Sequence, residues 1–360
     1  MYSEGTNSEG TNSGLATEVR LRLNSPPDVV AAVPYLLGFH PRDSLVLVSI
    51  GDRRVSLVSR IDLPPLTEAK SVAGHLARIV EEQSCDEVLV VIVGGGADHD
   101  VPPRTDVVAA ARAAFGKIGI PVSSAVWVPE VTVGATWRCY DSDAGGTLPD
   151  PTSSPVAAAT VAAGHVTYPD RQHLEQLVSP ADPADLDRRS RLLDSHCDQQ
   201  CDQLRGPSEL DEPDRGADAF ALLRTWVEKA GAESLDLGDD DIVMLCVALS
   251  DPMVRDAAFG LADGPYAAGA ERLWTALVRE FPDPEAAEPA VLLAYSALVR
   301  GNGALVGIAL ERAQRAWPGH RMSELFQSAM DGGLGPDELH GWFAEGAAEA
   351  RLLLRRRGSR

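Results

Sequence analysis

The stretch from Ser25 to Ile50 contains complete signals for a helix followed directly by a buried strand. Ser25 is a favoured N-cap residue, and the proline after it stands where a helix needs no N–H donor. Gly38 suits the left-handed position that ends a helix, and a proline three residues later prevents the helix from resuming. Leu45 to Ile50 is almost entirely apolar, which is typical of a central strand covered on both faces. The stretch therefore predicts the start of an α/β sheet.

Strand and helix patterns then alternate as far as residue 150. The segment Asp86–Val93 is strongly apolar, and Gly51-Asp52 is a turn signal between two strands. Strands that alternate with helices favour a mixed sheet with parallel pairs. We therefore predict an α/β N-terminal domain, residues 17–150, with a mixed, partly parallel sheet. Its expected strands are Glu18–Leu23, Leu45–Ile50, Arg53–Leu63, Asp86–Val93, Val122–Val128 and Ala135–Asp141, and its further helices are Thr67–Gln83 and Thr105–Lys117.

Strand signals end near Ser154, and the remaining chain is predicted to be all-α. It divides into a helical connecting region (151–250), a helical-repeat-like region (251–352) and a basic C-terminal tail (353–360). Pro284 and Pro318 lie 34 positions apart, and several other residue pairs share that offset. A 34-residue helix-turn-helix period is typical of tetratricopeptide-like repeats, and a plain array of helical hairpins is the alternative. The expected helices are Pro155–Ala163, Asp170–Val178, Pro183–Arg205, Arg215–Ala230 and Asp239–Leu249, with a linker at Gly206–Gly216.

Composition and charge indicate the compartment and exclude some partners. Residues 1–16 contain two copies of S-E-G-T-N with little to bury, which predicts a disordered tail. The five cysteines are scattered and odd in number, as expected for free thiols in a reducing cytoplasm. No secretory signal is visible, and no apolar run approaches the roughly 18 residues of a membrane helix. The net charge of −21 makes nucleic acid a poor candidate partner. We expect a cytoplasmic, acidic protein that binds no membrane.

Five short segments outside the tail carry a family resemblance. They are P-Y-L-L-G-F-H-P-R-D-S-L-V (Pro34–Val46), I-D-L-P (Ile61–Pro64), W-R-C-Y (Trp137–Tyr140), D-P-M-V-R-D-A (Asp251–Ala257) and R-G-N-G-A-L-V-G-I-A-L-E-R-A (Arg300–Ala313). In them the chain resembles DUF4192, an actinobacterial family of unknown function. The resemblance implies a cytoplasmic protein and brings no assigned activity. Many members look Cys-rich where this chain has D-S-D-A-G-G-T-L-P, so no metal or redox site is expected there.

Two polar loops of the predicted sheet are candidate ligand sites. The turn from His40 to Ser44 precedes a buried strand, and its polar groups suit either a small anion or the hydrogen bonds of the turn itself. The Gly94-Gly95-Gly96 loop leaves the carboxyl end of a strand, where open α/β sheets place ligands, although it matches no nucleotide-binding pattern. The candidate ligand-binding residues, with two from an adjoining strand end, are Arg42, Asp43, Arg60, Asp62, Gly94, Gly95, Gly96, Asp98 and His99.

Two further groups favour packing over chemistry. Arg138 and Tyr140 are expected on one face of their strand and Trp137 on the other, a pattern more typical of packing than of base stacking. Cys197 and Cys201 lie four apart on one helical face, but no second ligand pair follows at a spacing that zinc requires. We predict no metal site, no cofactor and no catalytic residue.

Two functions from different classes fit these observations. The preferred hypothesis is a non-enzymatic interaction or regulatory protein that binds a protein partner through its helical-repeat surface. The alternative is an α/β small-ligand-binding protein or hydrolase-like enzyme that uses the loop Gly94–Asp100. The motifs G-x-S-x-G, H-E-x-x-H and C-x-x-C are absent from the sequence, which favours the first hypothesis without excluding an enzyme. The sequence does not indicate an oligomeric state.

Overall fold

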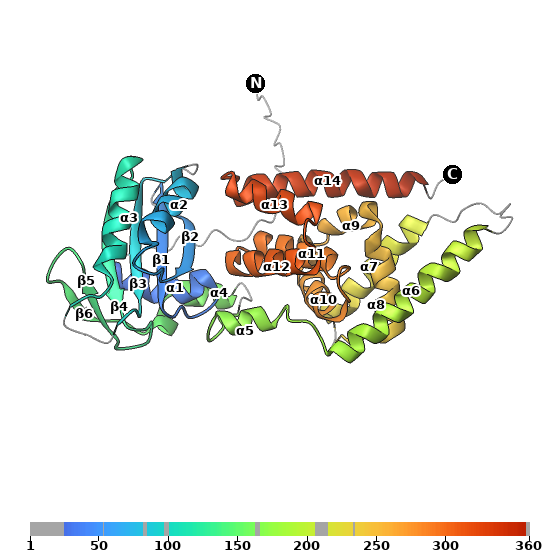
Figure 1. Cartoon of the computed structure of the whole chain (residues 1–360), viewed down its shortest axis with the longest axis horizontal. Helices are drawn as coiled ribbons and strands as arrows, with labels where there is room; N and C mark the ends of the chain where they lie inside the picture. Colours follow the sequence, from blue (N-terminus) through green and yellow to red (C-terminus); the bar gives the residue numbers. More distant parts are fainter. Residues whose placement is uncertain are drawn as a thin grey trace, which may run out of the picture.

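The computed structural model describes residues 25–52, 54–81, 85–96, 101–162, 166–205, 215–232 and 235–357. Within these ranges an N-terminal sheet with flanking helices is followed by a region built of helices, and the two lie side by side in an elongated molecule (Figure 1). The predicted disordered tail and the predicted strand Glu18–Leu23 fall outside the described residues, as does most of the predicted linker.

The sheet has six described strands in the order β2-β1-β3-β4-β5-β6. Only β3 and β4 pair in parallel; the other neighbouring strands are antiparallel. The prediction of a mixed, partly parallel sheet is therefore confirmed. β6 lies in the Pro/Gly/Asp-rich passage after residue 141, where no strand was predicted. The bounds are β1 Ser44–Gly51, β2 Arg54–Asp62, β3 Glu87–Val93, β4 Val122–Val128, β5 Thr136–Cys139 and β6 Gly145–Thr147.

Helices cover both faces of the sheet. α2 (Ala69–Glu81) and α3 (Thr105–Lys117) cover one face, where Leu45 and Leu47 of β1 are buried among them. Val46 and Val48 point to the opposite face and join the core that contains α1 (Pro26–Leu37). Both sets of side chains are at most 2% exposed. Burial on both faces is what the apolar run in β1 predicted for a central strand.

The helical region surrounds one almost completely buried helix. Ten of the twelve residues from Ala287 to Leu298 in α11 are apolar and buried, so that helices pack around its whole circumference. The helices after the sheet are α4 Pro155–Ala162, α5 Arg171–Gln176, α6 Pro183–Arg205, α7 Arg215–Ala232, α8 Asp239–Ser250, α9 Pro252–Phe259, α10 Ala267–Glu280, α11 Ala287–Val299, α12 Gly303–Ala316, α13 Arg321–Asp331 and α14 Pro336–Arg357, with 3₁₀ turns at Pro151–Ser153 and Gly264–Tyr266.

Two features of this region qualify the predicted domain divisions. α14 continues through residues 353–357, the first part of the expected basic tail. α14 also packs mainly along α9 and touches α7 and α11, so it returns across the bundle, as Figure 1 shows.

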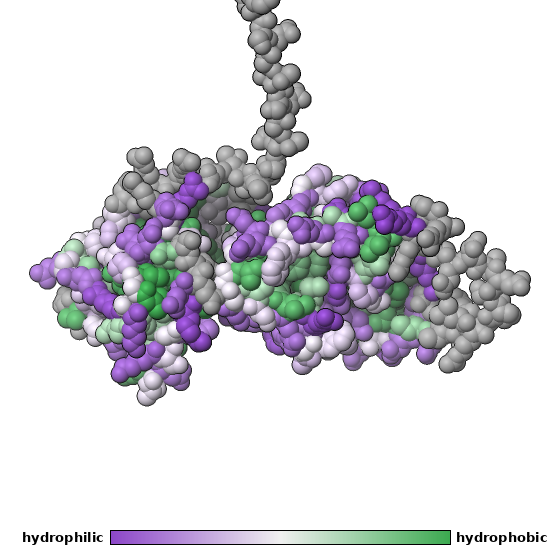
Figure 2. All heavy atoms as spheres, turned by 90° about the horizontal axis from the view of Figure 1, so that it is seen from above, coloured by the Kyte–Doolittle hydropathy of each residue, from purple (hydrophilic) through white to green (hydrophobic). Residues whose placement is uncertain are grey.

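In Figure 2, hydrophilic side chains are spread over both halves of the molecule, and the apolar ones form small separate patches.

The corner between α1 and β1 joins the two regions. Gly38 ends α1 with a φ of 79°, and its carbonyl accepts a hydrogen bond from the N–H of Tyr168 at 2.7 Å. His40 donates its N–H to the carbonyl of Tyr168 at 3.0 Å. Nearby, Arg171 of α5 contacts Glu311 of α12 at 3.3 Å. One hydrophobic cluster contains side chains from α1, from the adjacent sheet face and from the helical region.

Candidate functional site

The two predicted loops meet at one edge of the sheet. Ser44 at the start of β1 pairs with Asp62 at the end of β2 and with Val93 at the end of β3, because β1 is antiparallel to both neighbours. The His40–Ser44 turn and the glycine loop after β3 are therefore adjacent in space. Seven of the nine candidate residues are described and lie at this edge; Asp98 and His99 fall outside the described residues.

Asp43 links the two loops through its side-chain carboxylate. Its Oδ1 accepts the N–H of Gly95 at 2.9 Å, and its own carbonyl accepts the N–H of Leu63 at 2.8 Å. A Cβ on Gly94, whose φ is +74°, would lie 2.5 Å from the same Oδ1. Glycine is thus needed at position 94 so that the carboxylate can approach. The prediction that Asp43 is a ligand contact gains no support, because its carboxylate already binds within the protein.

Arg60 is also held by the protein itself. Its Nε donates to Ser44 Oγ at 2.7 Å, and its Nη2 donates to the carbonyl of Arg42 at 3.3 Å. The same guanidinium contacts Asp62 at 2.5 Å and stands over the Phe39 ring at 5.8 Å from the ring centre. These contacts explain the cluster as a reinforced corner.

The side chain of Arg42 is exposed, and its charge acts weakly on Asp170, the N-cap residue of α5. The pKa of Asp170 lies below its ordinary value, chiefly because His173 donates hydrogen bonds to the carboxylate and to a lesser degree because of the Arg42 charge.

Arg104 is a residue of this edge that the sequence analysis did not single out. It has a φ of 57°, donates from Nη2 to the carbonyl of Pro64 at 2.6 Å, and contacts Asp106 at 3.1 Å. The hydrogen bond from Arg104 lowers the pKa of Asp106. Its partner Pro64 lies 40 positions away, so no local pattern announced the contact.

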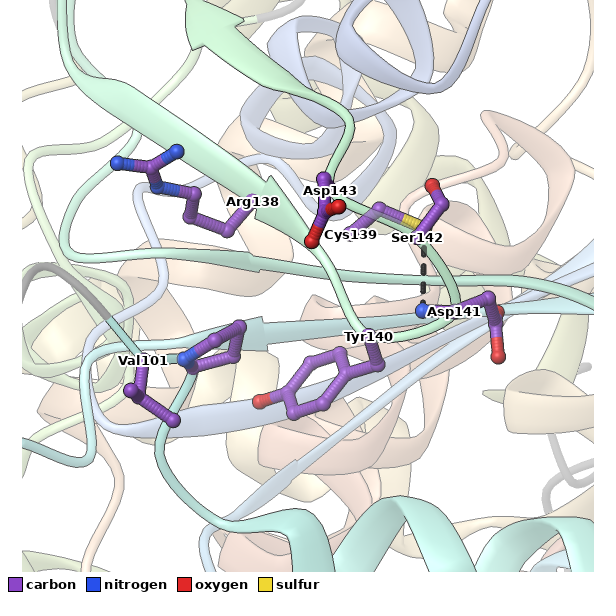
Figure 3. Close-up of a pocket in the computed structure, with 8 residues that line it drawn as sticks. Val101, Arg138, Cys139, Tyr140, Asp141, Ser142 and Asp143 are labelled. Carbon is purple, nitrogen blue, oxygen red and sulfur yellow. Dashed lines mark hydrogen bonds between the residues drawn. The ribbon is translucent and has the colours of Figure 1, made fainter.

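A cavity of about 410 Å³ lies beside this edge, between residues Val101 and Pro102, which precede α3, and strand β5 with the turn that follows it (Figure 3). Tyr140 fixes one wall by donating its hydroxyl to the carbonyl of Pro103, and Asp141 forms an ion pair with Arg112 of α3. Burial raises the pKa of Tyr140, so the hydroxyl remains a donor at neutral pH. The cavity is lined by Val101, Pro102, Arg138, Cys139, Tyr140, Asp141, Ser142 and Asp143.

Strand alternation correctly predicted which side chains of this strand share a face. Trp137 packs against the core on the α1 side of the sheet, whereas Tyr140 packs on the α2 and α3 side. Arg138 pairs with Trp127 of β4, whose indole is buried on the same side as Tyr140. The sequence therefore identified the shared face of Arg138 and Tyr140, but it gave no sign that the loop before α3 would enclose a space there.

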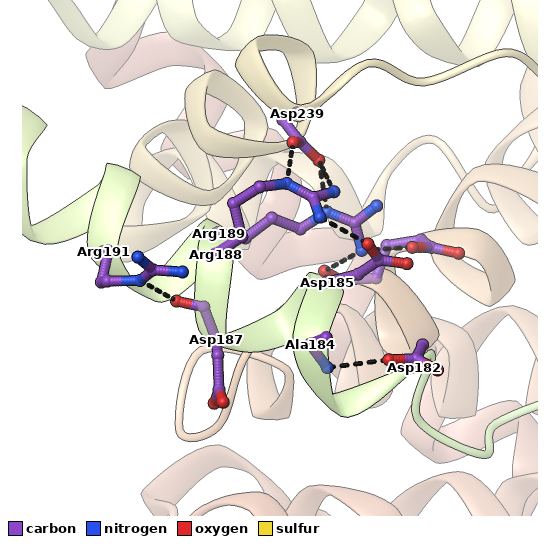
Figure 4. A network of polar contacts seen from close by, with 9 residues as sticks. Asp182, Ala184, Asp185, Asp187, Arg188, Arg189, Arg191 and Asp239 are labelled. Atoms are coloured by element: carbon purple, nitrogen blue, oxygen red, sulfur yellow. Dashed lines mark hydrogen bonds and ion pairs between the residues drawn. The ribbon is translucent and has the colours of Figure 1, made fainter.

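A second polar network lies in the helical region (Figure 4). Arg189, which is 7% exposed, donates from Nε to Asp239 Oδ1 at 2.9 Å and also contacts the Glu280 carboxylate. Arg188 contacts the same Asp239 at 2.5 Å and Asp185 at 2.6 Å. The hydrogen bond from Arg188 is the main reason that the pKa of Asp239 is lowered to about 2. This network ties α6 to α8 and α10, and it explains these charges as structural.

Comparisons with known proteins place the chain in a family. No helix in the described part of the chain is long and apolar enough to cross a membrane. No curated protein and no solved structure is significantly similar to the chain. The family model described as "Domain of unknown function (DUF4192)" matches residues 26–337, which include both the sheet and most of the helical region. The chain therefore belongs to the DUF4192 family.

Proposed function

We propose that this protein is a non-enzymatic interaction protein whose helical region binds an acidic segment of a partner protein. The observation that carries the proposal is a groove of about 190 Å³ between α7 and α14. Ala217 and Phe220 of α7 and Leu354 of α14 supply apolar lining, and Leu354 is only 2% exposed. Arginines from both helices supply the polar lining: Arg224, Arg351 and Arg355.

The arginines are unusual in their setting, since the whole chain carries a net charge of −21. Arg351 lies so close to Gly260 at the end of α9 that a Cβ there would be 2.6 Å from its Nη2, so the guanidinium packs against this glycine. An apolar floor with a cationic rim is complementary to a segment that carries both carboxylates and an apolar side chain. The negative charge of most of this protein would repel an acidic partner elsewhere on the surface, so the partner segment would bind at the groove and in one orientation.

The helical-repeat part of the proposal rests on the 34-residue period. α11 and α12 pack as a hairpin joined by Arg300–Asn302, in the first of the two periodic units. Repeat arrays of helical hairpins commonly bind partner segments along one surface. We propose tetratricopeptide-like character for α11 to α14, with α14 supplying one side of the groove.

Affinity purification from the native host tests the proposal. Tagged wild-type protein, the double variant Arg351→Glu/Arg355→Glu and the control Arg191→Glu are purified side by side, and bound proteins are quantified by mass spectrometry. Arg191 is an exposed arginine of α6 whose Nε donates to the carbonyl of Asp187. We expect a stoichiometric partner with wild type and control, lost in the double variant and weakened by salt. A partner retained by the double variant, or the absence of any stoichiometric partner, would contradict the proposal.

A small-ligand-binding role for the α/β region is the second candidate. The observation that favours it is the cavity of Figure 3, which adjoins the loop that follows the predicted glycine run. Asp43 accepts a hydrogen bond from Gly95, and Arg60 donates one to Ser44, so these polar groups already have partners within the protein. We therefore propose the cavity, and not these residues, as the ligand site. Thermal-shift screening with small ligands is the general test, and no rise in melting temperature with any ligand would argue against this role.

A further inference from the structure

We infer that the cavity beside β5 binds a small zwitterion of the amino-acid type, with Arg138 holding its carboxylate and Asp143 its ammonium group. The inference rests on the second candidate function, the small-ligand role of the α/β region. It is independent of the α7/α14 groove, which lies in the other half of the molecule. Two charged side chains and their surroundings carry it.

A glycine on the neighbouring strand β6 makes space for the Arg138 side chain. Arg138 of β5 pairs with Gly145 of β6. A Cβ at Gly145 would lie 2.8 Å from the Trp137 carbonyl oxygen, 3.0 Å from Arg138 Cδ and 3.3 Å from Arg138 Nη1. A larger residue at position 145 would therefore crowd both the backbone of β5 and the present position of the arginine. Arg138 is also one of the residues that line the cavity (Figure 3).

Arg138 lacks the partners that other arginines of low exposure in the described chain have. Its Nε is buried without a hydrogen bond, and no described residue forms an ion pair with its guanidinium. Arg60, Arg104 and Arg189 each bind a carboxylate, and all three also bind a backbone carbonyl. Because Nε is covered by protein, a ligand carboxylate would bind the Nη groups, which can offer two parallel N–H donors. The guanidinium is thus placed as an anchor for an anionic group.

The cavity lining also contains two carboxylates, which narrows the class of ligand that it can bind. The Asp141 carboxylate is neutralised by its ion pair with Arg112. Asp143 forms no ion pair with any described residue. A ligand with two or more negative charges would face this carboxylate, whereas one that also carries an ammonium group would bind it. Val101, Pro102 and the fixed ring of Tyr140 supply apolar surface for the rest of the ligand.

The size of the cavity suits this class. Its volume is about 410 Å³, near the lower end of the range of about 300–1,000 Å³ that is usual for small-molecule sites. Amino acids are small enough for a cavity of this volume. The structure thus assigns the charge pattern of the ligand, and the identity of its side chain is left to experiment.

Saturation-transfer NMR with the full-length protein tests the inference directly. The probe is a mixture of the proteinogenic amino acids, observed alone and in competition with succinate and with inorganic phosphate. We expect transfer to one or a few amino acids. Arg138→Ala should weaken their binding about tenfold or more, as expected for the loss of a paired charge, and Asp143→Asn should weaken it as well. Succinate and phosphate, which lack an ammonium group, should compete poorly.

The control variant is Arg78→Ala, which removes an exposed guanidinium from α2 in the same region. It should leave binding unchanged. Arg138→Gln is a second variant for the case in which Arg138→Ala does not fold, as judged by circular dichroism. Transfer to no amino acid, equal transfer with wild type and folded Arg138 variants, or competition by succinate or phosphate as effective as that of the bound amino acid would each overturn the inference. Failure here would leave the partner-binding groove untouched, since its test uses other residues and another readout.

Discussion

Replacement of Gly94 by alanine should weaken the corner where the two loops meet. Two costs combine at this position. The φ of +74° strains any residue with a Cβ, at about 1–2 kcal/mol. The new Cβ would also lie 2.5 Å from Asp43 Oδ1, so Asp43 must move away from the Gly95 N–H. A hydrogen bond to a charged group contributes about 1.5–3 kcal/mol. We therefore expect a loss of about 2.5–5 kcal/mol in the free energy of unfolding.

Two other glycines separate these costs. Gly134 has a φ of +76° and no atom within 4 Å of an added Cβ, so Gly134→Ala should cost only the backbone strain of about 1–2 kcal/mol. Gly74 lies inside α2 with open space around it, so Gly74→Ala should stabilise the protein by about 0.5–1 kcal/mol. In an Asp43→Gly background, the cost of Gly94→Ala should fall but stay above that of Gly134→Ala, because the backbone nitrogen of residue 43 would still lie 3.1 Å from the new Cβ.

Urea denaturation is the assay for this series. Unfolding is followed by far-UV circular dichroism and by tryptophan fluorescence, and a single free energy is taken only where the two transitions coincide. The order of stability should be Gly74→Ala, wild type, Gly134→Ala, Gly94→Ala. If Gly94→Ala costs no more than Gly134→Ala, or if Asp43→Gly does not relieve it, the contact between the two loops does not hold the corner.

Two further predictions concern the helical region. The lowered pKa of Asp239, about 2 against 3.8, contributes stability above about pH 3.8 that is lost as the pH falls through about 2. Asp239→Asn should therefore flatten the decline in stability over that interval, measured as urea midpoints at successive pH values. An unchanged decline would show that the contacts of Asp239 with Arg188 and Arg189 are not the source. A Cβ on Gly269 of α10 would lie 2.1 Å from the carbonyl oxygen of Val227 in α7. Gly269→Ala should lower the free energy of unfolding by about 3 kcal/mol or more. Gly307→Ala, with no atom within 4 Å of the new Cβ, should be neutral or slightly stabilising. Thermal melts compare the two variants, and equal melting temperatures would refute the close approach of α7 and α10.

Local signals were sufficient to predict many elements of the fold. The helix Thr105–Lys117, the strand Val122–Val128 and the helix Pro183–Arg205 have the predicted bounds. Each is marked within its own sequence by apolar spacing and by the residues that flank it. β6 was missed because its three residues, two of them glycines, are exposed and are held mainly by pairing with β5. Such a strand carries no hydrophobic pattern of its own.

The candidate site depended on pairings that no local pattern encodes. The sequence placed polar residues in two loops, but only the antiparallel pairing of β1 with β3 brings Asp43 to Gly95, 52 positions away. The same pairing lets the polar groups of the two loops form hydrogen bonds within the protein. Arg138 was placed on the correct face, yet the cavity exists because a loop 37 positions earlier accepts the Tyr140 hydroxyl. Distant contacts of this kind separate a structural corner from a binding site.

The backbone bridge between Phe39 and Tyr168 has a consequence for how the family can change over evolution. It joins the end of the first helix to the connecting region, and Asn302 at the start of α12 lies 3.4 Å from where a Cβ on Gly38 would be. A substitution in any one of these three segments therefore alters the fit of the other two. The sheet and the helical bundle should be inherited as a single unit, with replacements near Gly38 and near Asn302 that vary together. Recombination at the boundary near residue 150 should yield chains that expose apolar surface on both sides of the break.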